Sequence, residues 1–508
     1  MARPTHLSLL AVLSIALIAG PGALVGQQEK LPRLLLTNAL VVDGTGAPAR
    51  HADVLIEGER IAAIESPGTI ELGGTFAVED LAGLVLAPGF IDIHNHSTNR
   101  IQGDPAATTQ VAQGVTTIVV GADGSSPWPI AEYLGRIETI GPALNVATLV
   151  GHGTVRTQVL GDDYRRQASS EQVAAMERLV RRGMEEGAFG LSSGLEYDPG
   201  FYSSTEELID LCRVAAQYGG FYMSHMRDEE EGVLGAIAEA IRIGAATGIP
   251  IQISHIKMGN ASVWGKAADA LALIEQANER GIDVSADQYP YAAWQSGLGI
   301  IVSSRRFSDP AQVAQGLADA GGAQRLQITS YEHDATTNGM RLSEIATREG
   351  KTDVEMYIEM MRNGGAEIIG HTMNEDDVAA FMVSPRVMTA SDGGISSSHP
   401  RGAGAFARVL GHYSRELGLL SLERAVQRGT SMPARRLSLG DRGVIRVGAY
   451  ADLVAFDRDT IADRSTFTKP RITAVGVHKT WVAGTPVWED GKPTGERPGR
   501  VLRRSANR

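Results

Sequence analysis

The sequence contains a single cysteine, Cys212, among its 508 residues, so no disulfide bond can form within the chain. Cys212 lies in TEELIDLCRVAAQYGG, an amphipathic pattern that predicts a helix with this thiol in the core. The chain also lacks an excess of positive charge, because its formal net charge is -12. An acidic surface argues against nucleic acid and against anionic lipid as main partners. We expect a small-molecule or short peptide-like substrate instead.

Long hydrophobic runs are also missing, except near the N-terminus. There Arg3 precedes an apolar run from Leu7 to Ala19, which the helix-breaking triplet at 20–22 ends. A run of this length is short for a membrane span and typical of a signal peptide, which we assign to residues 1–26. We therefore expect a periplasmic or secreted protein without stable membrane insertion after cleavage. An uncleaved anchor is the alternative, and homo-oligomer formation stays open.

Short strand patterns occur at both ends of the chain. LLLTNALVVDGTG and ADVLIEGERIAAIESPG near the start, and GVIRVGAYADLVAFD and AVGVHKTWVAGTPVWEDG near the end, alternate apolar runs with glycine turns. Each flank is too short to bury a core of its own. We expect residues 31–86 and 432–490 to form one small β-sandwich domain that is split by the segment between them.

The middle of the chain, residues 87–431, repeats a strand–loop–helix pattern. Eight apolar runs recur in it, namely LVLAPGFIDIH, VTTIVVG, NVATLVG, GAFGLSS, GGFYMSH, IPIQISH, IDVSADQY and RVMTASDGG. Strands that alternate with helices predict parallel βα units, and eight such units predict an α/β fold of the closed (β/α)₈ barrel type. The long interval before the last strand predicts an insertion within about 295–385.

Polar side chains stand at the ends of these strands, where barrel enzymes carry their chemistry. They are His94 and His96 after the first strand, Glu196 after the fourth, His225 and His255 at the ends of the fifth and sixth, and Asp392 after the eighth. His94 and His96 are two residues apart and so face the same side of a strand end. Neutral imidazoles and carboxylates in this arrangement predict a zinc site.

These six residues are enough to hold two divalent ions. His94, His96 and Asp392 would bind one ion, and His225 and His255 would bind the other. A carboxylate must join them, and Glu196 is the preferred bridge because no lysine that could be carboxylated stands after the fourth strand. Asp123, in the GADG loop after the second strand, is the second choice. Alternatively, Asp123 is an ordinary turn residue before glycine.

The motifs GFIDIHNH, GVTTIVVG, GHGTVR, GLEYDPG, SHMRDE, SHIK, DQYPY, SDGG and HPRGAGAFARVLG together resemble the amidohydrolase superfamily and, within it, the N-acyl-D-amino-acid deacylases (D-aminoacylases). The resemblance spans about Leu34 to Thr485. It implies a barrel with a split β-sandwich, one or two zinc ions per chain, and hydrolysis of a linear amide by a water that the metal activates. Asp392 would serve as general base and then as general acid.

The resemblance also implies residues that bind a substrate carboxylate. Lys257, Tyr289 and Arg401 match the corresponding positions, with Tyr289 preferred over Tyr291. One departure concerns the metal. Many D-aminoacylases carry a ligand cysteine in a GNCG loop, whereas this chain has Asp123 at that position. A carboxylate in place of a thiolate suits a binuclear site and admits manganese or cobalt as well as zinc.

Three other interpretations share these features. A cyclic amidase has the same barrel but usually a lysine bridge, which this sequence lacks. A dipeptidase or isopeptidase would act on peptide-like substrates outside the cytoplasm. A non-catalytic amidohydrolase-like scaffold would typically lose the metal ligands, whereas this chain keeps its histidines and Asp392.

Overall fold

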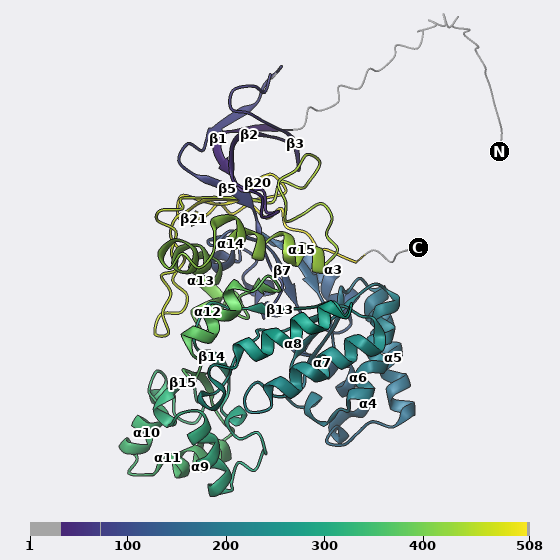
Figure 1. Ribbon diagram of the computed structural model, residues 1–508, viewed down its shortest axis with the longest axis vertical. Coiled ribbons are helices and arrows are strands. Elements are labelled where there is room, and N and C mark those ends of the chain that lie inside the picture. Colours follow the sequence, from purple (N-terminus) through teal and green to yellow (C-terminus); the bar gives the residue numbers. More distant parts are fainter. Residues whose placement is uncertain (1–31, 72, 505–508) are drawn as a thin grey trace, which may run out of the picture.

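The computed structural model describes residues 32–71 and 73–504, so the predicted signal peptide, residues 1–26, lies outside the described residues. Within them the chain forms a β-domain, a barrel surrounded by helices, and a subdomain beside the barrel (Figure 1). Over these same ranges, no helix has the length and apolar content that a membrane crossing requires. The Cys212 thiol is buried, as expected for a core residue.

The eight predicted core strands are present and parallel. They are β6 (Phe90–Asp92), β7 (Val115–Val120), β8 (Asn145–Thr148) with its continuation β9 (Val150–Gly151), β10 (Gly190–Gly194), β11 (Phe221–His225), β12 (Ile251–Ile253), β13 (Val284–Gln288) and β17 (Val387–Thr389). The hydrogen-bonded order is β6-β7-β8 and β9-β10-β11-β12-β13-β17. A parallel bridge between Asn95 and Gly393 joins the first strand to the last. The barrel therefore closes, and the carboxyl ends of all its strands meet at one mouth.

Helices surround this barrel and connect its strands. They are α1 (Arg100–Gly103), α2 (Thr108–Val111), α3 (Ile130–Ile140), α4 (His152–Leu160), α5 (Ser170–Glu185), α6 (Thr205–Gln217), α7 (Val233–Thr247), α8 (Ala267–Glu279), α12 (Glu375–Val383), α13 (Arg401–Arg408) and α14 (Leu422–Arg428). A π-helical stretch, Val409–Glu416, follows α13. Ser169 and Ser204 cap α5 and α6 with their side-chain oxygens, which fixes where these helices begin.

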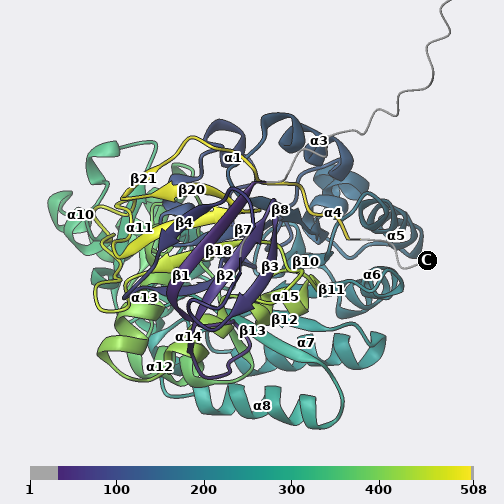
Figure 2. The ribbon, with the colours of Figure 1, turned by 90° about the horizontal axis from the view of Figure 1, so that it is seen from above.

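Both chain ends contribute to one nine-stranded sheet. Its strands are β1 (Arg33–Val41), β2 (Arg50–Glu57), β3 (Arg60–Glu65), β4 (Ala77–Asp80), β5 (Val85–Pro88), β18 (Leu453–Phe456), β19 (Val477–Val482), β20 (Thr485–Glu489) and β21 (Lys492–Pro493). β5 joins the two flanks, because it pairs with β1 on one side and β18 on the other. Val54, Leu453 and Trp481 share a buried core on one face. Figure 2 shows this sheet lying across the barrel.

The domain boundaries differ slightly from the predicted 86/87 and 431/432. β5 extends the flanking sheet to Pro88. After the barrel, α15 (Ser431–Arg436) still packs against it, because Met432 and Ala434 share a core cluster with Ile91. The chain later returns to the barrel, where the amide of Leu502 donates to the carbonyl of Val146. β5 continues to Pro88 because it pairs there with Leu453 of β18, whereas α15 stays with the barrel because its apolar side chains are buried against it. No local sequence signal marks either contact.

An insertion lies between β13 and β17. It contains the antiparallel sheet β14-β16-β15, made of Trp294–Gly297, Glu367–Gly370 and Leu326–Ser330. Three helices cover this sheet, namely α9 (Pro310–Asp319), α10 (Leu342–Arg348) and α11 (Asp353–Arg362). The subdomain projects from one side of the barrel (Figure 1), and its first strand borders the barrel mouth.

Candidate metal centre and active site

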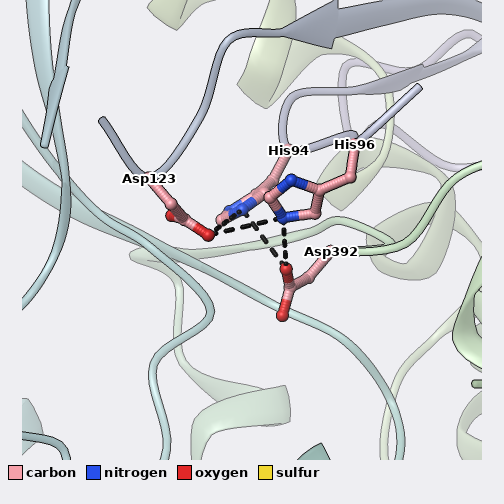
Figure 3. A group of neighbouring side chains, drawn as sticks. All are labelled: His94, His96, Asp123 and Asp392. Atoms are coloured by element: carbon pink, nitrogen blue, oxygen red, sulfur yellow. Dashed lines mark hydrogen bonds and ion pairs between the residues drawn. The ribbon is translucent and has the colours of Figure 1, made fainter. Parts of the chain in front are cut away.

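Four predicted or considered ligands meet at the barrel mouth. His94 and His96 follow β6, Asp123 follows β7, and Asp392 follows β17. The Nε2 atoms of His94 and His96 each lie 3.3 Å from Asp123 Oδ2, and they lie 3.3 and 3.0 Å from Asp392 Oδ1. Figure 3 shows the two imidazoles and the two carboxylates pointing toward one another. We call these four residues the first ligand group.

A second ligand group contains His225, His255 and again Asp123. Nδ1 of His225 lies 2.9 Å from Nε2 of His255, and the latter lies 3.6 Å from Asp123 Oδ2. In both groups the candidate ligand atoms lie within 4.8 Å of one another. Asp123 is therefore the carboxylate that the two groups share.

The preferred bridge, Glu196, belongs to neither of these two groups. Its Oε2 lies 2.9 Å from Nε2 of His225, which is the ring nitrogen turned away from His255. The group of possible ligands that includes Glu196 contains His225 and Glu229, but neither His94 nor Asp392. Asp123, in the loop after β7, lies within reach of both groups, whereas Glu196, in the loop after β10, contacts only His225 among their members. Asp123, the second choice of the sequence analysis, is the carboxylate common to both groups, and its role as the bridge between two ions stays a prediction.

Three of these residues have an unusual backbone. Asp123, His255 and Asp392 have φ values of +52°, +31° and +47°, in a region that L-residues rarely adopt. Such conformations cost on the order of 1–3 kcal/mol each and concentrate at functional sites. The amide of Asp392 donates to the carbonyl of His94 at 3.0 Å, so its loop is held while its side chain faces the first group.

Two further carboxylates contact the outer ring nitrogens, and the sequence analysis missed both. Asp287 Oδ1 lies 3.3 Å from Nδ1 of His94, and Glu229 Oε1 lies 3.0 Å from Nδ1 of His255. Such partners fix the tautomer and the orientation of metal-binding histidines. Asp287 stands in DQYPY at the end of β13, so the reasoning that selected polar residues at strand ends could also have selected Asp287. Glu229 lies in the acidic run RDEEEG, and the sequence gives no reason to select one of these acidic residues over the others.

Burial and charge shift the pKa values of the cluster strongly. Burial opposes ionisation of Asp123, but the imidazoles of His94 and His255 outweigh it and hold the pKa of this carboxyl well below its usual range. Burial lowers the pKa of His225 to about 4. Burial also acts on His255, yet the Glu229 carboxylate overcomes it and raises the pKa to about 9. His225 is therefore neutral near pH 7, whereas His255 carries a proton that a metal ion must displace.

The donor set suits a divalent metal. Four imidazoles and two carboxylates converge, and Asp123 Oδ1 is a buried oxygen without a hydrogen-bond partner among the described residues. Leaving a buried carboxylate oxygen unpaired is costly, and a bound cation removes that cost. Imidazole nitrogen and carboxylate oxygen are the ligands that zinc and related metals prefer. The residues present therefore fit one or two such ions, with Asp123 shared.

The predicted substrate-binding residues border the same region. The ammonium of Lys257 is buried, bonds to the Glu229 carboxylate and lies 2.8 Å from Nδ1 of His255. Arg401, the first residue of α13, donates to Asp392 Oδ2 at 2.6 Å, and its guanidinium lies 4.7 Å from the ring centre of Tyr289. Tyr291 instead donates to Asp463. Lys257 and Arg401 thus line the cavity, whereas Tyr289 lies behind Arg401 and its hydroxyl donates to Met373 Sδ at 3.6 Å. Contact of the three residues with a substrate stays a prediction.

A cavity of about 510 Å³ opens over the two ligand groups. Its wall includes His96, Lys257, Trp294, Ile300, Glu367 and Arg401. Trp294 and Glu367 come from the inserted subdomain, so this insertion forms part of the cavity wall. The cavity therefore places a ligand of modest size directly above the metal-binding side chains.

Comparison with known proteins identifies relatives over almost the whole chain. A family model described as "Amidohydrolase family" matches residues 77–488. The chain is 37% identical to a D-aminoacylase of Alcaligenes xylosoxydans over 498 residues, which covers 93% of this chain and 98% of that one.

Solved structures of similar proteins show the same fold. A D-aminoacylase with a binuclear metal centre, studied for one-metal activation and second-metal attenuation, aligns with a TM-score of 0.83 at 37% identity, over 93% of this chain and 99% of that one. N-acyl-D-glutamate deacylase from Bordetella bronchiseptica, in complex with zinc and a phosphonate mimic of the tetrahedral intermediate, aligns with a TM-score of 0.83 at 35% identity, over 94% and 100%.

Proposed function

Because this chain belongs to the amidohydrolase family and, within it, to the N-acyl-D-amino-acid deacylases, we propose that it hydrolyses the amide bond of N-acyl-D-amino acids. The observation that carries this proposal is the pair of ligand groups that share Asp123 at the floor of the cavity. His94, His96, Asp123, His225, His255 and Asp392 would hold one or two divalent ions, zinc above all. When bound, such an ion supplies a water of lowered pKa and a Lewis acid for the amide carbonyl.

Asp392 performs the proton transfer in this proposal. Its Oδ1 faces the first ligand group, while its Oδ2 is held by Arg401. Burial raises the pKa of this carboxyl, but the charges of Arg401 and of the imidazoles outweigh burial and keep the pKa far below its usual range in the metal-free protein. Asp392 is therefore ionised, which is the form that a general base needs, and in this proposal it accepts a proton from the attacking water. It then delivers that proton to the nitrogen of the leaving amine.

Arg401, Tyr289 and Lys257 would orient the substrate through its α-carboxylate. Arg401 lines the cavity and is only 6% exposed, so a carboxylate that reaches it leaves bulk water. Tyr289 lies beneath its guanidinium and restricts where the charge can move. Lys257 adds a second positive charge on the cavity wall. Two cations on the wall of one cavity favour a substrate with a free carboxylate over an uncharged cyclic amide.

A substrate panel tests this function. We would remove metal with a chelator, restore zinc, manganese or cobalt, and measure release of amine from N-acetyl-D- and N-acetyl-L-amino acids, D- and L-dipeptides, and a cyclic imide. The proposal expects hydrolysis that depends on metal and is fastest with the N-acetyl-D-amino acids. Preferential cleavage of dipeptides would favour the peptidase alternative. No turnover of any member by the metal-loaded protein would contradict the function.

We also propose that the protein acts in the periplasm or outside the cell. The support is the basic Arg3, the apolar run from Leu7 to Ala19 and the breaker at 20–22. Expression of the full chain in a bacterium, followed by fractionation and N-terminal sequencing, would test this. We expect a mature protein that begins near residue 27. An intact N-terminus in the cytoplasmic fraction would contradict export, and an intact one in the membrane fraction would favour the anchor.

A further inference from the structure

Glu196 lies on the far side of His225 from the metal-binding cluster. The imidazole of His225 turns Nδ1 toward His255, at 2.9 Å from its Nε2, and turns Nε2 toward Glu196, at 2.9 Å from Oε2. Both side chains are largely shielded from solvent, with exposed fractions of 2% for His225 and 10% for Glu196. The two ring nitrogens of one imidazole point in different directions, so Glu196 lies at one edge of the ring, and an ion held by Nδ1 would lie at the other edge.

This arrangement gives Glu196 a role other than metal binding. If Nδ1 is the atom that faces an ion, the proton of the neutral imidazole must lie on Nε2. Nε2 then donates to Glu196, which fixes both the tautomer and the plane of the ring. Resting on the metal-dependent function proposed above, we propose that Glu196 is a positioning residue for His225. In the same proposal, Arg305 of the inserted subdomain holds the loop that carries Glu196 in place, and we call this contact the bracing.

The bracing contacts come from the insertion. Arg305 Nη2 donates to the main-chain carbonyl of Glu196 at 2.5 Å, and Arg305 Nη1 pairs with Asp198. The same guanidinium lies 4.1 Å from the ring centre of Phe201. One side chain of the insertion therefore holds the loop after β10 at three points, on both sides of Tyr197.

A second contact links the same two segments. The ring centre of Tyr197 lies 4.3 Å from that of His225, and its hydroxyl lies 3.2 Å from Ser296 Oγ in β14. His225 is thus held by a carboxylate at one edge and by an aromatic ring against its face, and both belong to one loop. The backbone of Arg305 has φ +57°, a costly conformation for arginine, and its side-chain contacts offset that cost.

Three variants separate positioning from ligation at Glu196. Glu196→Gln keeps an oxygen that accepts a hydrogen bond from Nε2, whereas Glu196→Leu and Glu196→Ala remove it. We would measure by chelator competition the affinity of the zinc ion that the second ligand group binds, which we call the first zinc ion because this group is expected to fill first. We would also record the visible spectrum of the cobalt-substituted protein. Loss of such an outer partner lowers metal affinity about 10–100-fold. We therefore expect that loss in the Leu and Ala variants, an altered cobalt spectrum, and near-normal values in the Gln variant.

Each other outcome overturns the proposal. A Gln variant as weak as the Leu variant would mean that the carboxylate itself binds metal. Wild-type affinity and spectrum in the Leu and Ala variants would mean that Glu196 only fills space. The melting temperature of each metal-free variant shows whether it folds, and the Ala variant serves if Leu does not fit. These measurements need no turnover, so they stay informative even if the deacylase assay fails.

Neighbouring arginines provide a matched control for the bracing. Arg306 is 63% exposed and its nearest acidic partner is Asp309, at 3.7 Å. We expect Arg305→Ala to weaken binding of the first zinc ion severalfold and Arg306→Ala to leave it unchanged. In the double variant, Arg305→Ala should add little to the effect of Glu196→Leu, because both substitutions act through His225. Equal effects of the two arginine variants, or full additivity with Glu196→Leu, would refute the bracing.

Discussion

The two ligand groups at the barrel mouth share Asp123 but differ in how firmly their histidines are held. His225 and His255 have exposed fractions of 2% and 3%, and a carboxylate contacts the outer nitrogen of each, Glu196 and Glu229 respectively. In the first group, His94 is equally buried and contacts Asp287. His96 is 43% exposed, and its Nδ1 has no hydrogen-bond partner within residues 32–71 and 73–504.

This difference indicates different tasks for the two groups. Side chains that are fixed before binding lose less conformational entropy when they ligate an ion. The second group, His225, His255 and Asp123, is therefore expected to take the first metal ion and to hold it more tightly. The first group includes Asp392, the proton-transfer residue, and has the more open histidine. It is expected to exchange its ion more readily.

Removing the shared carboxylate should have the largest effect. Asp123→Ala is expected to lower metal content below one ion per chain and to abolish activity, because both groups lose a ligand. Asp123→Cys should keep at least one ion, since a thiolate also binds zinc. Metal analysis of both variants after exhaustive dialysis makes the test. Full stoichiometry in Asp123→Ala would contradict a shared Asp123.

Asp392→Asn should remove catalysis while sparing the second group. The variant keeps the shape and an oxygen but cannot accept the proton, so we expect kcat to fall about 10²–10⁴-fold. Metal content should stay at one ion or more, and the melting temperature should change little. The measurement is kcat and melting temperature on one preparation with excess zinc. Near-normal kcat with a lowered melting temperature would make Asp392 a turn residue.

Substituting one histidine from each group compares the groups directly. His255→Ala should weaken the first zinc ion strongly, whereas His96→Ala should leave the first ion in place and weaken only the second. Chelator competition with each variant, at matched protein and zinc concentrations, resolves the two binding steps. If His96→Ala weakened the tighter binding step and His255→Ala did not, the first group would bind zinc more tightly than the second. Burial and the carboxylates at the outer ring nitrogens would then not determine the zinc affinity.

The smallest expected effect is a pH dependence of metal binding. His255 has a pKa of about 9 in the metal-free fold, above the ordinary value of 6.5, because of Glu229 despite burial. The bound proton therefore stabilises the metal-free protein fully below pH 6.5, and this stabilisation disappears as pH rises through about 9. Zinc must displace that proton, so its affinity should rise up to about tenfold per pH unit between pH 7 and 9.

Zinc titrations across pH 7–9.5 measure this effect, with His255→Ala as the control that should flatten the slope. The melting temperature of the metal-free protein should fall over the same range, by less in the variant. A zinc affinity that does not change with pH would show that His255 is already neutral at pH 7.

The sequence predicted the strands, and thereby the place where the histidines gather, because the signals are local. Each apolar run ends at a strand end, and a histidine there must face the mouth. The sequence analysis preferred Glu196 to Asp123, because the loop paths after β7 and β10 that bring Asp123 to both groups cannot be predicted from the sequence. The φ of +52° turns Asp123 inward, and Arg305, more than a hundred residues away in the sequence, holds the Glu196 loop. Neither constraint is visible in a local pattern.

Diffraction from crystals of the zinc-loaded protein, recorded at the zinc absorption edge, tests the central claim most directly. Anomalous peaks locate the ions without reference to any assumed ligand. We predict that an oxygen of Asp123 lies about 2.0–2.2 Å from zinc in the second group, that Asp123 also contacts any ion in the first group, and that Glu196 contacts neither. A zinc ion bound by Glu196, with Asp123 outside bonding distance, would contradict the account.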